Sequence, residues 1–292
     1  MKSKIMQMTI ILFLILLFIN YNIVLSSSLM AVDIWLKKVF PYLFIMFIIN
    51  DSLINLNFHH NFSLNVFVFI ASLLSGAPSS AFIINNLYQK KAISKNNANY
   101  LLLWTYFSNP LFLYAMFNSL FSFSITLKLI LIHYLSNLLI YLFQKKHLSL
   151  NNIYQNELTN FNIASSIKKS MNTLIMILGT ITFYMVVTNI FAHTFNFNQI
   201  FTIILKGFLE ITQGLNNLSV LSNVILKQFL ALSFISFGGL SIHTQVKCIL
   251  QEFDLDYKFF LKGRIFQLLI ANSLLFLTIC TQTIIANISI IS

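Results

Sequence analysis

Glu210 is an acidic residue inside an otherwise apolar stretch, Ile200 to Leu215. Ionisable side chains within membrane segments are costly and face the interior of a bundle or a cavity. Glu210 is therefore a candidate to hydrogen-bond a ligand hydroxyl or base, or to carry a coupling proton. Lys206 lies four residues earlier, on the same face of a continuous helix, so a simple ion pair is the alternative interpretation.

Two polar clusters interrupt apolar segments of the chain. The first contains Ser75, Gly76, Pro78 and Ser79, and the second contains Gly238, Gly239 and Ser241. Backbone that stops being helical at membrane depth must be shielded by protein or line a water-filled cavity, and broken helices in two halves point to a transporter-like site. We expect Ser79 and Ser241 to cap the helices that follow. Two tight turns between packed helices are the alternative.

Four further polar residues belong to the predicted binding site. His243 and Gln245 follow the second break, and Asn109 and Asn272 lie in apolar stretches downstream of the two breaks. Each can exchange hydrogen bonds with a solute, although interhelical bonding is the alternative for both asparagines. Asp51, flanked by Asn50 and Ser52, is interpreted as a helix cap at the interface rather than a site residue.

The composition indicates a polytopic membrane protein. Of 292 residues 58% are hydrophobic and 9% charged, with a mean hydropathy of +0.81. The net charge of +11 comes mostly from lysines that flank apolar segments, as expected of loops on the cytoplasmic side, and nucleic acid is not an expected partner. No HExxH, GxSxG or phosphate-binding loop is present, so we expect neither catalysis nor a cofactor, and no metal site.

Apolar runs of about 20 residues predict the membrane spans. The clean candidates are Ile5–Leu25, Tyr100–Phe117, Ile125–Phe143, Met171–Ala192 and Ile265–Ile291. Shorter or interrupted pieces surround the two breaks, which indicates re-entrant segments. The fold class predicted is an all-α membrane protein with two repeats: residues 1–143 with a hairpin around 62–91, a polar and cytoplasmic linker at 144–170, and residues 171–292 with a hairpin around 218–250.

Spacing supports the repeat, since Gly76 to Asn109 and Gly239 to Asn272 are both 33 positions (109−76 and 272−239). The orientation stays open at this point. If Val39–Leu56 spans the membrane, the repeats are parallel; if the segments of Asp51 and Glu210 lie at the interface, the repeats are inverted, as is common in secondary transporters.

Four stretches carry a resemblance to a known family. They are Ser75–Ser94 (SGAPSSAFIINNLYQKKAIS), Phe107–Phe112 (FSNPLF), Gly207–Gly214 (GFLEITQG) and Phe237–Val246 (FGGLSIHTQV). In this order they resemble the sporulation integral membrane protein YlbJ family, whose members carry the nucleoside-recognition or "Gate" domain also met in concentrative nucleoside transporters. Ala77 and Ser80 depart from the family, which often has an aromatic residue and a glycine there. The resemblance implies a bacterial cell-membrane protein connected with endospore formation.

Two functions follow as hypotheses. In the first, the protein is transporter-like and binds a small polar, nucleoside-like solute where two hairpins meet, with H⁺ or Na⁺ as a coupling ion. In the second, it is a non-transporting membrane scaffold for assembly of the spore envelope. The expected partners are membrane lipid, the solute, and further copies of the chain as a homo-oligomer.

Overall fold

The computed structural model describes residues 2–56, 64–144, 162–251 and 254–291, which contain helices and no strand. The first half contains α1 (Lys2–Ile19), α2 (Tyr21–Ile34), the π-helical turn η1 (Trp35–Val39), α3 (Phe40–Asn55), α4 (Leu64–Ser75), α5 (Ser79–Gln89), α6 (Lys95–Trp104), α7 (Pro110–Asn118) and α8 (Phe123–Gln144). The second half contains α9 (Ile163–Phe195), α10 (Gln199–Leu209), α11 (Ile211–Asn217), the 3₁₀ turn η4 (Leu218–Val220), α12 (Val224–Phe237), α13 (Gly239–Gln251) and α14 (Tyr257–Ile291). The fold is all-helical, as predicted.

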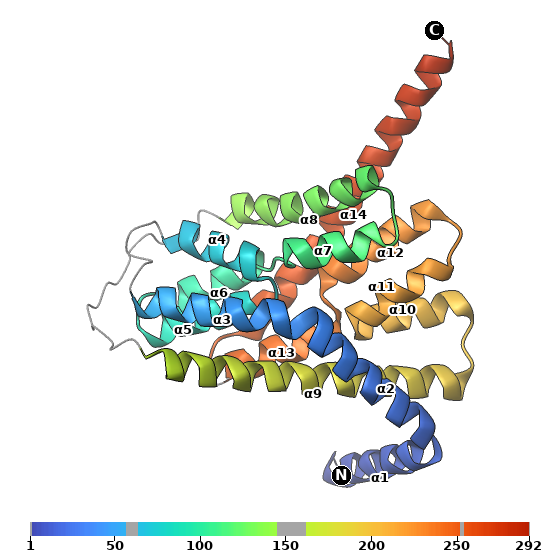
Figure 1. Ribbon diagram of the computed structural model, residues 1–292. Coiled ribbons are helices and arrows are strands. Elements are labelled where there is room, and N and C mark those ends of the chain that lie inside the picture. Colours follow the sequence, from blue (N-terminus) through green and yellow to red (C-terminus); the bar gives the residue numbers. More distant parts are fainter. Residues whose placement is uncertain (1, 57–63, 145–161, 252–253, 292) are drawn as a thin grey trace.

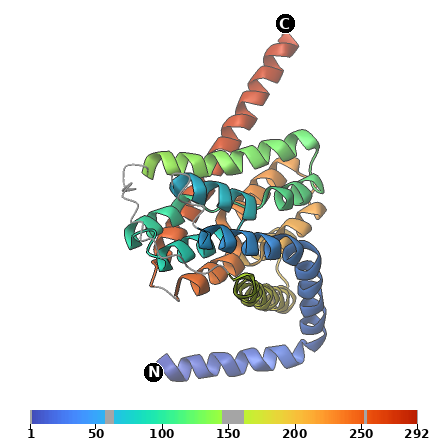
Figure 2. The same ribbon diagram turned by 60° about the vertical axis from the view of Figure 1, so that its left-hand side comes forward.

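Four stretches of the described chain are helical, long and apolar enough to cross a membrane: Phe123–Gln144, Ile163–Phe195, Val224–Gln251 and Tyr257–Ile284. The predicted span Ile5–Leu25 is wrong as a single straight helix, because the chain bends by 89° between α1 and α2. α1 therefore lies at the edge of the bundle, where the ring of Phe13 contacts that of Phe183 on α9, while the end of α14 extends beyond the bundle on the opposite side (Figure 2). A fifth span results only if the bent pair is counted as one. The chain is a membrane protein by this measure.

The second half repeats the element order of the first half in the opposite direction. α2, η1 and α3 form a continuous bent rod that packs along α9. The hairpin of α4 and α5 enters from the linker end of the molecule, and the hairpin of α10 and α11 enters from the other end (Figure 1). Each hairpin is followed by a pair of helices separated by a break, α6–α7 and α12–α13, and then by a long helix, α8 or α14. The same order of elements thus starts from opposite ends of the molecule in the two halves.

This order corrects the predicted second hairpin. Residues 218–250 do not fold back on themselves, because α12 and α13 continue one another as the single candidate span Val224–Gln251. The hairpin lies earlier, at α10 and α11, with Glu210 at its tip. The N-caps of α5 and α11, Pro78 and Glu210, are 132 positions apart (210−78), and the ends of α6 and α12 are 133 apart (237−104). The 33-residue spacing from Gly76 to Asn109 and from Gly239 to Asn272 therefore paired breaks that do not correspond.

Of the predicted linker, residues 145–161 lie outside the described residues and α9 begins at Ile163.

Asparagine explains many of the helix starts. The side chains of Asn109, Asn162, Asn198 and Asn223 accept hydrogen bonds from the first backbone amides of α7, α9, α10 and α12. Such caps satisfy amides that have no partner within the helix. Short helices can consequently begin within an apolar sequence.

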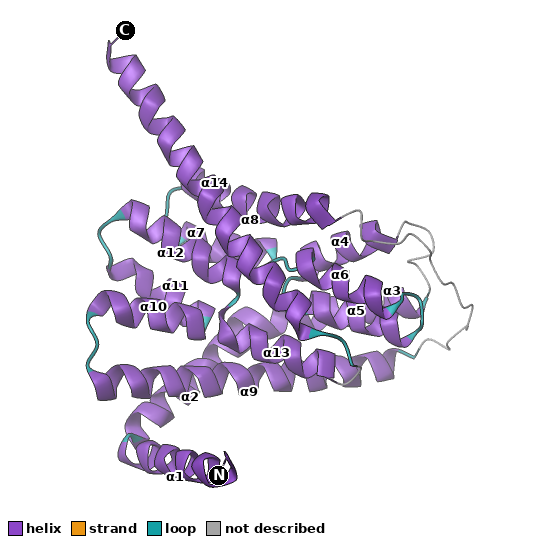
Figure 3. Ribbon diagram, turned by 180° about the vertical axis from the view of Figure 1, so that it is seen from behind, coloured by secondary structure: helices purple, strands orange, loops and turns teal. Residues whose placement is uncertain are grey.

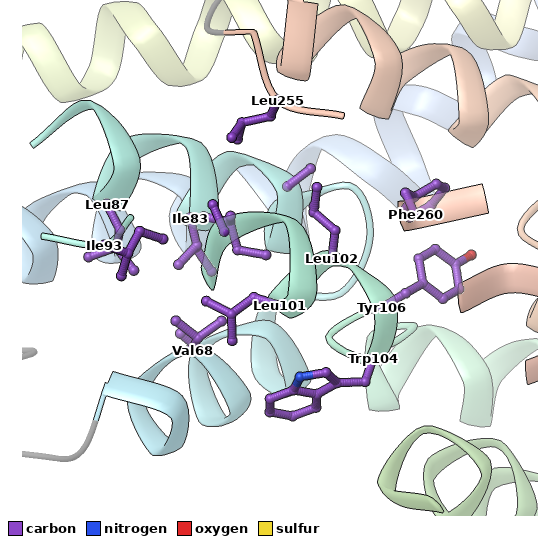
Figure 4. Close-up of a cluster of buried hydrophobic side chains, with 14 of the residues drawn as sticks. Val68, Ile83, Leu87, Ile93, Leu101, Leu102, Trp104, Tyr106, Leu255 and Phe260 are labelled. Carbon is purple, nitrogen blue, oxygen red and sulfur yellow. The ribbon is translucent and has the colours of Figure 1, made fainter. Parts of the chain in front are cut away.

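Two hydrophobic clusters flank the centre of the molecule. One joins α4, α5 and α6 to α13 and the start of α14, and Figure 4 shows Val68, Ile83 and Leu101 pointing toward one another within it. The other joins α7 and α8 to α10, α11, α12 and α14. Seen from behind, α14 crosses the bundle between the two hairpins (Figure 3). The first hairpin packs against α6 of its own half and α13 of the other half, and the second hairpin packs against α12 of its own half and α7 of the other half.

The α10–α11 hairpin is closed by a contact between two glycines. A Cβ atom added at Gly214 would lie 2.1 Å from the Cα atom of Gly207. Because the contacted atom belongs to the backbone and cannot turn aside, the two helices must separate to accept any larger residue at Gly214. This contact gives the stretch GFLEITQG a physical explanation.

We therefore expect Gly214→Ala to destabilise the protein by about 1–3 kcal/mol, the usual cost of overpacking a core. Thermal unfolding of the purified protein in detergent measures the effect. Gly179→Ala is the matched control, since its added Cβ would meet no atom within 4 Å and alanine stabilises an exposed helix by up to about 1 kcal/mol. Equal unfolding temperatures for the two variants would contradict the close contact.

Candidate functional site

A cavity of about 90 Å³ lies where the two hairpin tips and the two broken pairs meet. Its polar lining comes from Lys38, Ser108, Asn109, Glu210, Thr212, Ser241 and Gln245. Pro78 from the α4–α5 tip lines it too, and most of the remaining wall is apolar. Five residues of the predicted site thus share one cavity: Pro78, Asn109, Glu210, Ser241 and Gln245.

Glu210 forms the tip of the α10–α11 hairpin. Its backbone is extended (φ −142°, ψ 115°), and its carboxylate caps α11 by accepting a hydrogen bond from the amide of Gln213 at 2.8 Å. The hydroxyl of Thr212 donates to the same carboxylate oxygen. Lys206 forms no ion pair with Glu210, because the helix that would align them ends between the two. The ion-pair alternative is therefore wrong.

Asn109 joins the first hairpin tip to the break between α6 and α7. Its amide nitrogen donates to the carbonyl of Leu74 at 2.8 Å, and its amide oxygen accepts from the backbone amides of Leu111 and Phe112. Gly76 has φ +77°, and a Cβ there would lie 2.6 Å from the backbone nitrogen of Asn109. Gly76 thus permits the close approach rather than contacting the cavity.

The serines do not cap the helices as expected. Pro78 is the N-cap of α5 and forms no side-chain cap, and Ser241 is the third residue of α13. The hydroxyls of Ser79 and Ser241 are buried and have no hydrogen-bond partner, whereas Ser75 donates to the carbonyl of Ala71 at 2.6 Å. Of the three, only Ser241 lines the cavity.

Gly238 and Gly239 shape the second break. Both have positive φ, +96° and +58°, which glycine adopts without steric cost. A Cβ at Gly238 would lie 2.8 Å from the hydroxyl oxygen of Tyr106, and one at Gly239 would lie 3.1 Å from the side chain of Ile211. Their role in the structure is close packing, not lining of the cavity.

The other predicted polar residues separate into two groups. Gln245 lines the cavity and donates to the hydroxyl of Thr180 at 2.9 Å. His243 lies outside the cavity lining, hydrogen-bonded to the hydroxyl of Tyr257 at 2.6 Å and to the carbonyl of Phe237 at 2.9 Å. Asn272 is also outside it and exchanges hydrogen bonds with Ser233 on α12. The structure therefore does not bring Asn272 to Asn109.

Arg264, which the sequence analysis missed, is fully buried beside the two breaks. Its guanidinium donates to the carbonyls of Leu103 at 3.3 Å and Ser236 at 3.5 Å, near the C-terminal ends of α6 and α12. Its central carbon lies 4.0 Å from the ring centroid of Tyr106. No carboxylate of the described residues pairs with it. The signal was present, because this is the only arginine in a chain with many lysines.

Two features hold Arg264 in place without a counter-charge. Helix C-termini carry partial negative charge, which favours a cation at the ends of α6 and α12. Gly263 permits the approach of α14 to α6, since a Cβ there would lie 2.1 Å from the carbonyl oxygen of Leu103. Gln267, which accepts from Arg264, also donates to the carbonyl of His133 on α8. α6, α8, α12 and α14 thus meet in one polar network.

Asp51 is buried in the last turns of α3 and is not a cap. Its carboxylate accepts hydrogen bonds from Asn55 at 2.9 Å, Asn86 at 3.2 Å and Ser166 at 2.6 Å, and pairs with Lys169 at 3.3 Å. It therefore ties α3 to α5 and α9, at the linker end of the molecule and away from the cavity.

Replacing Arg264 by methionine is expected to lower stability by about 1–3 kcal/mol for each carbonyl left unpaired. Thermal unfolding in detergent, with Lys262→Met as the exposed control on the same helix, measures this. Equal stability of Arg264→Met and the control would contradict this prediction. It would mean that the free-energy cost of burying the guanidinium is at least as large as the stabilisation from its hydrogen bonds to the carbonyls.

No family model, no curated protein and no solved structure matches this chain. The resemblance to the YlbJ family rests on the four quoted stretches alone, and it stays a prediction.

Proposed function

We propose that this protein binds a small polar solute in the central cavity as a membrane carrier. The observation that carries the proposal is that two oppositely directed hairpin tips and the two helix breaks surround one cavity, which is lined by Glu210 from a tip, Asn109 from the first break, and Ser241 and Gln245 from α13. Sites at the interface of inverted repeats, built from interrupted helices, are characteristic of secondary transporters.

The chemistry of the lining favours a solute that donates hydrogen bonds. Glu210 supplies a carboxylate, and the unpartnered hydroxyl of Ser241 can donate or accept. α5, α7 and α13 all begin at this cavity and bring their partially positive ends to it. A neutral solute with both donors and acceptors, such as a nucleobase, matches this mixture.

The size of the cavity limits the solute. Pockets for drug-sized ligands are about 300–1,000 Å³, whereas this cavity has about 90 Å³. A complete nucleoside would need the hairpin tips to separate, and a free nucleobase needs less movement. A connection with endospore formation and with the bacterial cell membrane is part of the proposal through the family resemblance alone.

The proposal predicts that Glu210→Gln abolishes solute binding while the protein stays folded. A glutamine oxygen still accepts from the amide of Gln213 and so preserves the cap, but the negative charge is lost. A thermal-shift screen of the purified protein with uracil, adenine and uridine measures binding, because a ligand at 100 times its Kd stabilises the folded state by about 2.7 kcal/mol. We expect a thermal shift with a nucleobase in the wild type and no shift at the same nucleobase concentration in Glu210→Gln.

Asp33→Asn is the control for this experiment. Asp33 is exposed, pairs with Lys37 and is not among the residues that line the cavity, so its substitution makes the same change of charge without altering a lining residue. No shift with any compound in either wild type or control, with cooperative unfolding retained, would contradict the carrier proposal and favour the scaffold.

A further inference from the structure

The central cavity has a carboxylate in its buried part and a cation at its mouth. Glu210 is 3% exposed and Ser241 is 1% exposed. Of the described residues that line the cavity, only Lys38 is exposed, so Lys38 marks the mouth. No ion pair joins Lys38 to Glu210 or to another described residue. One cation and one carboxylate thus line the same cavity without pairing with each other.

The π-helical turn η1 gives Lys38 a different environment from its neighbour Lys37. Lys37 pairs with Asp33 at 2.5 Å, and both of these side chains are exposed. The turn is anchored by Trp35, whose buried indole nitrogen donates to the carbonyl of Leu174 on α9 at 3.0 Å. Single π turns within helices are rare and are frequently found at functional sites. Of two adjacent lysines, one is therefore engaged outside the cavity and the other lines it.

Glu210 keeps part of its carboxylate for a ligand. The hydroxyl of Thr212 and the backbone amide of Gln213 both donate to its oxygen Oε2, so Oε1 is the less engaged oxygen. The hydroxyl of Ser241 has no partner in the structure. An ammonium group has three donors and no acceptor, and a hydroxyl can donate or accept. An ammonium group at Glu210 would thus satisfy the carboxylate, and Ser241 can bond to either charged end of a ligand.

From these contacts we infer that the solute of the central cavity is a small zwitterionic amino acid. Its ammonium group binds Oε1 of Glu210, and its carboxylate binds the ammonium group of Lys38. The inference rests on the proposed function of this cavity and narrows the class of neutral solute. A nucleobase meets Glu210 and Ser241 but brings no negative charge to Lys38, so it binds more weakly. Free alanine also has fewer non-hydrogen atoms than uracil, which suits a cavity of about 90 Å³.

Compounds with one carbon skeleton separate the two charges. Near neutral pH, free alanine carries both charges, lactate carries only the carboxylate, alaninamide carries only the ammonium group, and lactamide carries neither. The unfolding temperature of the purified full-length protein is measured against the concentration of each compound, which gives an apparent Kd because binding to the folded state stabilises it. Uracil is measured beside them as the nucleobase.

We expect free alanine to bind at least about tenfold more tightly than lactate, alaninamide, lactamide or uracil, because hydrogen bonds between charged groups are about twice as strong as neutral ones. Lys38→Gln should make the apparent Kd values of alanine and alaninamide equal, and Lys38→Arg should preserve the preference for alanine. Lys37→Gln is the matched control, since it makes the same change of charge at a residue that does not line the cavity, and it should keep the wild-type ratio.

Separate results would overturn the inference and the proposed function. Alanine binding no more tightly than alaninamide or lactamide, with a thermal shift by uracil, would contradict the zwitterion and leave the carrier proposal in place. Equal loss of the preference for alanine in Lys37→Gln and Lys38→Gln, or its retention in both, would contradict the role of Lys38. No shift with alanine or with a nucleobase, with cooperative unfolding retained, would contradict both proposals. Because Lys38 is exposed and unpaired, its variants should unfold at the wild-type temperature without ligand.

Discussion

At each helix break in the centre of this protein, backbone carbonyls lose their hydrogen-bond partner within the helix and are shielded from water. The fold depends on supplying these carbonyls with other hydrogen-bond donors. An unpaired backbone group in hydrocarbon costs several kcal/mol. Here side chains from other helices supply the donors. Asn109 donates a hydrogen bond to the carbonyl of Leu74, and Asn137 on α8 donates one to the carbonyl of Tyr106. Arg264 donates to the carbonyls of Leu103 and Ser236. These bonds cross between helices, so satisfying the backbone also fixes the positions of the elements that surround the cavity.

The same constraint explains why the site residues have different roles. Glycines at the breaks admit close contacts, as at Gly76 and Gly238, and the cavity is lined instead by residues that begin helices, such as Asn109 and Glu210. A carboxylate or amide that caps a helix already has part of its hydrogen-bonding capacity engaged. Its remaining capacity faces the cavity in a fixed direction, which is the preorganisation that a binding site requires.

The sequence was sufficient to predict the helical membrane fold and several cavity residues, because hydropathy and polar residues within apolar runs are both local features of a sequence. Glu210 and Asn109 stand out as polar residues in apolar runs. The pairing of the repeats was not predictable in this way, since Ser75–Ser80 looks like Ser236–His243 but corresponds in the structure to the tip at Glu210. Arg264 stands out as the only arginine of the chain, but its partners are backbone carbonyls, so its residue type alone did not show what it binds. Asp51 was misread because its donors come from residues 86, 166 and 169.

The depth of the two hairpins has an electrical consequence. α5 and α10 each contain 11 residues and are therefore about 16 Å long, at 1.5 Å per residue, or roughly half of a hydrocarbon core of about 30 Å. If α10 begins at the membrane surface and runs along the membrane normal, Glu210 at its end lies near the middle of the voltage drop. Since one elementary charge crossing the whole membrane exchanges about 2.3 kcal/mol per 100 mV, a proton or cation that reaches Glu210 from either side exchanges about half of that. Occupancy of the cavity by a charged species would thus depend on the membrane potential. A potential that favours binding of the species from one side of the membrane would disfavour its binding from the other side.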